Sequence, residues 1–170
     1  MGNRRTHRRV LLITAVISRY DEAFEWTRQK MTDRFGAVEF EGPVFDFDQT
    51  SFYSRTMGEG LKKQFLAFSK LLPPDEIADA KVFTNQLEEQ FADSNQYPES
   101  RPLNIDPGYV TEAKLVLATT KDRDHRIYLR DGIFAEVTLH YQGDQWQTSR
   151  WTYPDYDLES SRSCFLGCRK

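Results

Sequence analysis

The sequence predicts an α+β fold, in which a ferredoxin-like β-α-β-β-α-β unit is extended by an antiparallel β-meander. The run Val10 to Ile17 is almost continuously apolar and β-branched, which is typical of a strand covered on both faces. Two later segments, 21–35 and 75–93, place apolar residues at helical spacing. From residue 113 onward, alternating segments follow one another through short polar or glycine-containing links, as in a meander.

The first helix follows the first strand directly. Asp21 is suited to cap it, its apolar positions recur at 24, 27, 31 and 35, and Gly36 supplies the left-handed residue that ends it. The segment 38–47 then alternates on either side of Gly42-Pro43, which predicts a strand interrupted by a bulge or turn.

The segment Leu61 to Leu72 fits both a helix and an alternating strand, and we favour the strand. Pro73-Pro74-Asp75 then begins a helix with one apolar stripe, which ends near Asp93. The polar, proline-containing stretch Ser94 to Arg101 predicts a surface loop that is the best candidate for mobility. Pro102 to Ile105 would be the fourth strand of the ferredoxin-like unit.

The meander consists of four predicted strands, at 113–119, 125–129, 133–141 and 146–153. Around Arg130-Asp131-Gly132, a three-residue loop with Gly132 in the left-handed bulge position gives the most consistent register. It places Ile127, Leu129, Ile133, Ala135 and Val137 on a core face. Arg126 then lies across from Glu136 on the opposite, polar face, together with Tyr128, Phe134, Thr138 and His140.

Composition indicates one core and a reducing compartment. With 39% hydrophobic residues, a chain of 170 residues can bury roughly two thirds of its unfolded surface. We expect a basic N-terminal tail at 1–9, a single α+β domain at 10–158 and a C-terminal tail or short helix at 159–170. The only two cysteines, Cys164 and Cys168, favour the cytoplasm.

Charge and motifs argue against several classes of partner. The 23 Lys and Arg against 26 Asp and Glu give a formal charge of −3, without the basic excess typical of nucleic-acid-binding proteins. No apolar run reaches the roughly 18 residues of a membrane span, and Gly58 and Gly60 do not form a P-loop. We predict no metal and no cofactor, and the sequence does not indicate an oligomeric state.

Two polar segments could bind a ligand. Pro107-Gly108 predicts a tight turn in which Asn104 and Asp106 bond to the backbone, although either residue could instead contact a ligand. The charged run 121–126 is either a solvated loop or an anion site.

Further candidates lie on the polar face and near the end of the meander. Arg126 and Glu136 form either a plain ion pair or the orienting part of a site. We expect His125 to be a hydrogen-bonded structural residue, and the aromatic segment Trp151 to Tyr156 either anchors the chain or stacks on a ring. The candidate ligand-binding residues are Asn104, Asp106, Lys121, Arg126, Tyr128, Glu136, His140, Trp151 and Asp155.

Long ungapped strings also resemble a known family. They include Tyr53 to Gly58, Lys81 to Asn85, Asn104 to Tyr109, Lys114 to Asp122 and Trp151 to Tyr156. On these strings the chain is similar to a bacterial family catalogued as domain of unknown function 4416, some members of which are labelled "GTP-binding protein". The resemblance implies a bacterial cytosolic protein without an established activity, and no functional residues that could be transferred.

Three hypotheses of function follow. The first is the binding of a small anionic or nucleotide-like ligand on the polar face of the sheet. The second is a protein or RNA interaction module that uses the Trp151 to Tyr156 aromatics. The third is an acid/base enzyme acting on a phosphorylated small molecule, with Asp106, His125 or Glu136 as acid and base; the sequence leaves enzymatic activity undecided.

Overall fold

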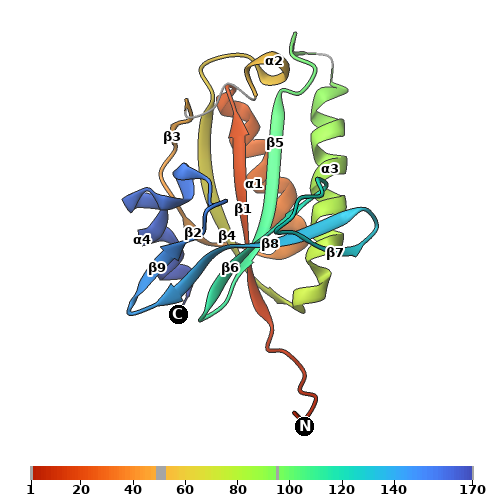
Figure 1. Ribbon diagram of the computed structural model, residues 1–170. Coiled ribbons are helices and arrows are strands. Elements are labelled where there is room, and N and C mark those ends of the chain that lie inside the picture. Colours follow the sequence, from red (N-terminus) through yellow and green to blue (C-terminus); the bar gives the residue numbers. More distant parts are fainter. Residues whose placement is uncertain (1, 49–52, 95, 170) are drawn as a thin grey trace.

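The computed structural model describes residues 2–48, 53–94 and 96–169, and it contains one antiparallel sheet of nine strands with helices packed against it (Figure 1). Met1, Asn95 and Lys170, which belong to the predicted tails and loop, lie outside the described residues. The strands are β1 Val10–Ser18, β2 Val38–Glu41, β3 Phe45–Asp46, β4 Lys62–Leu72, β5 Leu103–Val110, β6 Lys114–Thr119, β7 Ile127–Arg130, β8 Ile133–Gln142 and β9 Gln145–Thr148. Among the described residues, the α-helices are α1 Asp21–Phe35, α2 Ser54–Met57, α3 Ile77–Ala92 and α4 Glu159–Cys168.

The apolar run at the start of the chain forms the central strand, as predicted. β1 pairs with β4 on one side and with β5 on the other, in the order β2-β4-β1-β5-β6-β8-β7. Leu12 and Val16 contribute to the core under α1 and α3, whereas Ile13 and Ala15 contribute to a second core on the opposite face. Because both faces are covered, apolar residues occupy nearly every position of the strand.

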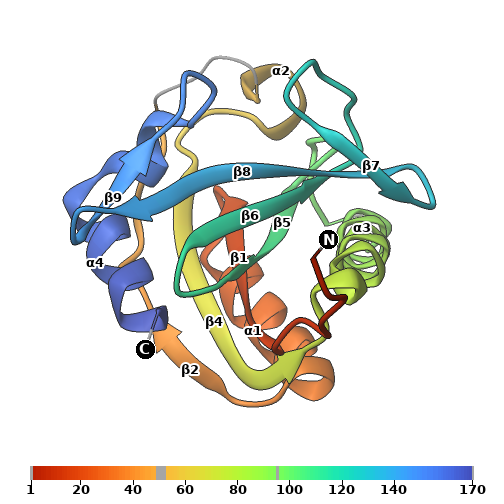
Figure 2. The same cartoon turned by 60° about the horizontal axis from the view of Figure 1, so that its bottom comes forward.

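The helices cover different faces of a strongly curved sheet (Figure 2). α1 and α3 lie on one face, where Met31 and Leu87 are fully or almost fully buried. α4 lies on the other face, where Phe165 is completely buried between Phe65 and Tyr156. Within the part of the chain that the structure describes, no helix combines the length and the apolar character needed to cross a membrane.

The predicted elements of the first half are confirmed, except for one detail. β2 and β3 are the two parts of the interrupted strand, Leu61 to Leu72 is a strand, and Gly36 has the expected positive φ of 83°. Asp21 does not cap α1. Its carboxylate instead accepts a hydrogen bond from Lys62 Nζ at 2.6 Å, while Ser18 Oγ accepts one from the Tyr20 amide.

The predicted turn at Pro107-Gly108 is wrong, because both residues lie inside β5. Pro107 pairs with Thr14, and Gly108 lies between Ile13 of β1 and Leu117 of β6. Glycine is needed there because a Cβ would lie only 2.4 Å from Val116 O. Close approach of two strands, rather than a turn, therefore explains this glycine.

The second half is not a simple meander. β7 pairs with β8 and not with β6, so residues 120–126 form a crossing connection. The β7–β8 turn has two residues, Asp131 and Gly132, both with positive φ, instead of the predicted three. A bulge at Leu129 adds one unpaired residue to β7. Ile127 therefore still pairs with Ala135, as predicted.

The predicted core face of this hairpin is right for Ile133, which is buried in the core, but wrong for other residues. Ile127 is 72% exposed and Val137 is 38% exposed, whereas Glu136 and Thr138 on the supposed polar face are buried. A buried carboxylate is stable only when it is paired. Glu136 accepts hydrogen bonds from Arg126 and Thr138, so polar partners rather than apolar packing determine which face is covered.

Candidate functional site

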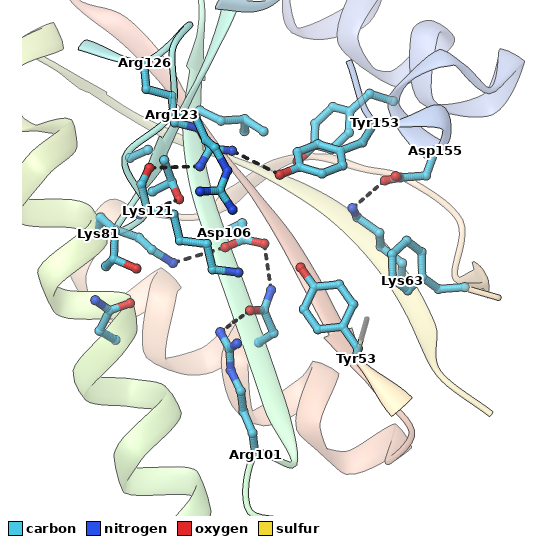
Figure 3. A pocket seen from close by; sticks show the side chains of 18 of the residues that line it. Tyr53, Lys63, Lys81, Arg101, Asp106, Lys121, Arg123, Arg126, Tyr153 and Asp155 are labelled. Atoms are coloured by element: carbon cyan, nitrogen blue, oxygen red, sulfur yellow. Dashed lines mark hydrogen bonds and ion pairs between the residues drawn. The ribbon is translucent and has the colours of Figure 1, made fainter. Parts of the chain in front are cut away.

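A cavity lies at the end of the sheet where β4 and β5 begin and β6 ends (Figure 3). Its volume is about 390 Å³, within the range of small-molecule sites. Its charged and polar lining comprises Lys63, Lys81, Asn85, Arg101, Asn104, Asp106, Thr119, Thr120, Lys121, Arg123, Arg126 and Asp155, and its aromatic lining comprises Phe47, Tyr53, Tyr153 and Tyr156.

The cavity opens because β5 and β6 diverge. They pair only between Gly108–Val110 and Leu115–Leu117, so the first half of β5 lacks a strand neighbour on that side. Side chains of α3 replace it: Glu88 Oε1 accepts from the Ile105 amide at 2.7 Å, and Lys81 Nζ donates to Ile105 O at 3.0 Å. The backbone of β5 is thereby satisfied without closing the sheet.

Asp106 points into this opening with both carboxylate oxygens engaged. Lys81 Nζ lies 3.1 Å from Oδ1, and Asn104 Nδ2 donates to Oδ2 at 2.7 Å. Burial alone would raise the pKa of Asp106, but Lys81, the Asn104 hydrogen bond and the more distant Lys63 lower it overall. Asp106 is therefore an ionised, well-held acceptor rather than a base waiting for a proton.

Arg101 extends the same network toward solvent. Its guanidinium donates to Asn104 Oδ1 and, at 3.1 Å, to Glu88 Oε2. Burial raises the pKa of Glu88, while Lys81 and Arg101 act in the opposite direction. Arg101 is thus held in place by partners on α3 and β5.

Lys63 and Asp155 form a second ion pair, which is almost completely buried. The Lys63 ammonium also lies 4.7 Å from the centre of the Tyr156 ring and 5.0 Å from that of Phe47. Asp155 is the second residue of the short 3₁₀ helix Pro154–Asp157, and its carbonyl accepts a hydrogen bond from the hydroxyl of Ser161 in α4. This pair fastens the end of the chain to β4.

The crossing connection 120–126 brings cations over the cavity. Burial lowers the pKa of Lys121, and the positive charges of Arg101, Arg126 and Arg123 lower it further, against the opposing effect of Asp106. Arg123 is exposed and donates to the carbonyl of Asp122, and within the described residues it makes no ion pair. Three cationic side chains of this connection, Lys121, Arg123 and Arg126, thus line the cavity.

Arg126 connects this loop to a buried polar layer. Its Nε donates to Glu136 Oε2 at 2.7 Å, and its terminal nitrogens donate to Lys121 O at 2.9 Å and to the Tyr153 hydroxyl at 3.2 Å. His125 Nε2 lies 3.0 Å from the same Glu136 oxygen, and its ring stacks on Trp151. The guanidinium is therefore fixed at the cavity edge.

Tyr53 and Tyr153 lie on the side of the cavity opposite Lys81, Lys121 and Arg123 (Figure 3). Burial and the nearby Asp106 carboxylate raise the pKa of Tyr53, and burial with Glu136 raises that of Tyr153. Both phenols therefore stay neutral near pH 7. We call Phe47, Tyr53, Tyr153 and Tyr156 the aromatic wall, and Lys81, Arg101, Lys121, Arg123 and Arg126 the cationic wall.

Several predicted site residues meet at this cavity. Asn104, Asp106, Lys121, Arg126 and Asp155 line it, and Glu136 lies directly behind Arg126. Three others lie elsewhere. Tyr128 is 57% exposed against Phe134, His140 pairs with Lys114 and Gln147 along β8, and Trp151 donates to Val137 O while stacking on His125.

The cavity is also lined by residues outside the list of candidates from sequence, of which Arg123 and Tyr153 do fall in segments named there: Lys63, Lys81, Arg101, Arg123, Tyr53 and Tyr153. Two of them carried a usable signal. Lys63 is the second residue of β4 and the first of its buried run 63–68, and Lys81 occupies a position on the apolar stripe of α3, one turn after Ile77. A lysine at a core position implies a buried anionic partner, because an unpaired buried charge is very costly.

Comparison with known proteins identifies a family but no activity. No curated protein and no solved structure matches the chain. The family model described as "Domain of unknown function (DUF4416)" matches residues 8–170, which is essentially the whole chain. The protein therefore belongs to the DUF4416 family.

Proposed function

We propose that this protein binds a small anionic ligand in the cavity between the cationic and aromatic walls. The observation that supports the proposal is the convergence of six cationic side chains, from four separate parts of the chain, on a cavity to which the described residues contribute two carboxylates. Both carboxylates already have lysine partners. Arginine and lysine side chains in such numbers favour phosphate or carboxylate groups.

Two finer assignments are part of the proposal. A nucleotide-like ligand would use both walls, because an aromatic side chain can stack on a base while arginine and lysine bind phosphate. The strand order β2-β4-β1-β5, with β1 antiparallel to both neighbours, supports a ferredoxin-like arrangement for the first half of the sheet. The cytoplasmic location and bacterial origin stay predictions.

Isothermal titration calorimetry with inorganic phosphate and pyrophosphate at low ionic strength tests the proposal. We expect binding that Arg123→Ala weakens about tenfold or more, since one hydrogen bond to a charged group contributes about 1.5–3 kcal/mol. Arg123 is suitable because it is exposed and its only described hydrogen bond is to the neighbouring Asp122 carbonyl.

Arg8→Ala is the matched control, because Arg8 is 90% exposed and pairs only with the exposed Glu112 among the described residues. It removes the same charge far from the cavity and should leave binding unchanged. Equal weakening by both variants would indicate non-specific attraction and would rule out this cavity as the site.

The interaction-module and enzyme alternatives stay predictions with less support. Trp151 stacks on His125, and its indole nitrogen is already hydrogen-bonded, so it is less available to a partner than an unattached ring. Glu136 is buried beneath Arg126 and His125, and both oxygens of Asp106 are occupied. Neither carboxylate is placed as an obvious acid or base.

A further inference from the structure

We infer that Cys164 and Cys168 form a redox-sensitive pair, in which hydrogen peroxide oxidises Cys164 and Cys168 then closes a reversible disulfide. The inference is independent of the proposed anion site. Three observations about α4 support it: the two thiols share one face of the helix, they contact each other, and they lie at its end.

The shared face of α4 packs against the core that contains Phe165. Cys164 and Cys168 are four residues apart, so they are neighbours on the helix surface. Cys168 belongs to this core and is buried, whereas Cys164 is half-buried and packs against its edge. An added Cβ on Gly42 would lie 3.7 Å from Cys164 Sγ. Of the two cysteines, Cys164 is therefore the one that a small solute can reach.

The contact between the thiols is a hydrogen bond, which Cys168 donates and the Cys164 sulfur accepts. This bond lowers the pKa of Cys164 against the opposing effect of burial. The same bond, together with burial, raises the pKa of Cys168. Because the thiolate and not the thiol is the nucleophile, Cys164 is the sulfur that reacts first.

The chemistry takes two steps. In the first, the Cys164 thiolate attacks one oxygen of hydrogen peroxide, the O–O bond breaks, and the other oxygen leaves as hydroxide. Cys164 is thereby oxidised to a sulfenic acid and the peroxide is reduced. In the second, the Cys168 sulfur attacks the Cys164 sulfur and the S–O bond breaks. The departing hydroxide takes the proton of the Cys168 thiol and leaves as water.

The position at the end of α4 allows the disulfide to close. Cβ atoms four residues apart in a helix are about 5–6 Å apart, whereas a disulfide requires about 3.5–4.5 Å. The last turn must therefore leave helical geometry. Cys168 is the last residue of α4 and Gly167 precedes it, and glycine has the lowest helix propensity after proline. Only the end of the helix, and not its middle, has to rearrange.

Oxidation should loosen the contact between the end of α4 and β2, which lie beside each other in Figure 2. In the reduced protein, Gly167 approaches β2 so closely that an added Cβ would lie 3.0 Å from the Phe40 ring. Cys168 is buried in the same region. A rearranged last turn therefore moves both residues away from their neighbours, so the oxidation state of the thiols controls the packing of this edge of the sheet.

Treatment of the full chain with a small excess of hydrogen peroxide tests the inference, followed by thiol titration and peptide mass spectrometry. We expect both thiols to be lost together, a disulfide to link Cys164 and Cys168 of the same chain, and both thiols to return with dithiothreitol. In the oxidised form, amide hydrogen exchange should become faster at residues 165–169 and 38–41. Far-UV circular dichroism should show that the rest of the fold persists.

Cys168→Ser and Cys168→Ala form the matched pair of variants. Neither can close the disulfide, so both should accumulate a sulfenic acid at Cys164, which dimedone traps. Ser keeps a hydrogen-bond donor and should react at about the rate of the unmodified chain. Ala removes the donor and should react about threefold or more slowly, because a smaller fraction of Cys164 is then thiolate.

Cys164→Ser is the control for the order of the two steps, and it should retain its Cys168 thiol under the same treatment. Circular dichroism establishes that each variant is folded before peroxide is added. Because Cys168 is buried, a variant at this position could lose stability. The disulfide mapping of the unmodified chain decides the inference in that case.

Several results would overturn the inference. Retention of both thiols in the unmodified chain, or disulfides between chains instead of within one chain, would rule out the pair. Oxidation of Cys168 in Cys164→Ser at the rate of the unmodified chain would rule out Cys164 as the first nucleophile. Equal rates in Cys168→Ala and Cys168→Ser would contradict activation by the hydrogen bond, and unchanged hydrogen exchange would contradict the unwinding of the last turn.

Discussion

Burial separates the lysines of the cavity into two kinds. Lys63 and Lys81 are almost completely buried, and each forms an ion pair with one lining carboxylate. Lys121 lies on an exposed connection, surrounded mainly by arginines. The buried pairs hold β4, β5 and the end of the chain in place, whereas Lys121 would respond to an anion bound as we propose.

Lys121 should take up protons when an anion binds. Burial and the neighbouring Arg101, Arg126 and Arg123 lower its pKa in the free protein, and a bound anion would raise that pKa again. At pH values between the lowered pKa of Lys121 and its ordinary value of 10.5, anion binding should therefore be accompanied by proton uptake. The affinity for the anion should fall as the pH rises through this window. Calorimetry in two buffers with different ionisation enthalpies measures the uptake.

Lys121→Arg is the control for that measurement. It keeps the positive charge but does not titrate in the same range, because the pKa of arginine is above about 12. Proton uptake should disappear while phosphate binding persists. If uptake is the same in the variant, another group is responsible.

In the free protein, stability should rise with pH across the same window, because there the unfolded chain binds more protons than the folded one.

At the scale of elements, the divergence of β5 from β6 creates the cavity, and Gly108 marks the last point of close contact. An added methyl group would lie 2.4 Å from Val116 O and 2.7 Å from Leu117 Cδ2. Gly108→Ala should therefore lower the free energy of unfolding by about 1–3 kcal/mol, the usual cost of overpacking. Urea denaturation measures the change.

Gly42→Ala serves as the comparison for Gly108. Gly42 is also buried, but its added Cβ would meet nothing nearer than 3.4 Å. Its effect on the denaturation midpoint should be small. Similar losses in both variants would mean that chain entropy, rather than the approach of the two strands, explains the effect at Gly108.

α4 is expected to stabilise the fold and not merely to end the chain. Phe165 is completely buried, with its ring centre 5.0 Å from that of Phe65 and 5.7 Å from that of Tyr156. Phe165→Ala should cost about 3–5 kcal/mol of stability by leaving a cavity. Leu166→Ala, on the 44% exposed neighbour, should change stability by no more than about 0.5 kcal/mol. Comparable effects in thermal denaturation would contradict this role.

Local patterns predicted the elements better than their pairing. The apolar run of β1 and the periodic stripes of α1 and α3 are direct consequences of burial, so sequence alone located them. The crossing of 120–126 over to β7 could not be predicted, because strand order depends on contacts between distant segments. The inward orientation of Glu136 was missed because its partners Arg126 and His125 make a polar side chain suitable for a buried face.

At the scale of the whole molecule, charge is distributed unevenly. The chain has a formal charge of −3, yet the cavity lining has six cationic groups against two carboxylates. The charged run 121–126 and the segment 104–106 were both predicted from sequence as candidates, and residues of both line the cavity. Lys63, Lys81 and Arg101 could not be joined to them from sequence, because only the fold brings β4, α3 and the start of β5 together.

Anion binding in this cavity can be tested with a crystal of the full chain soaked in sodium selenate, an anomalously scattering tetrahedral dianion. We expect an anomalous difference peak within hydrogen-bonding distance of Lys121, Arg123 and Arg126, and its loss in Arg123→Ala crystals. Selenate peaks elsewhere on the surface, with none in a cavity open to solvent, would contradict it.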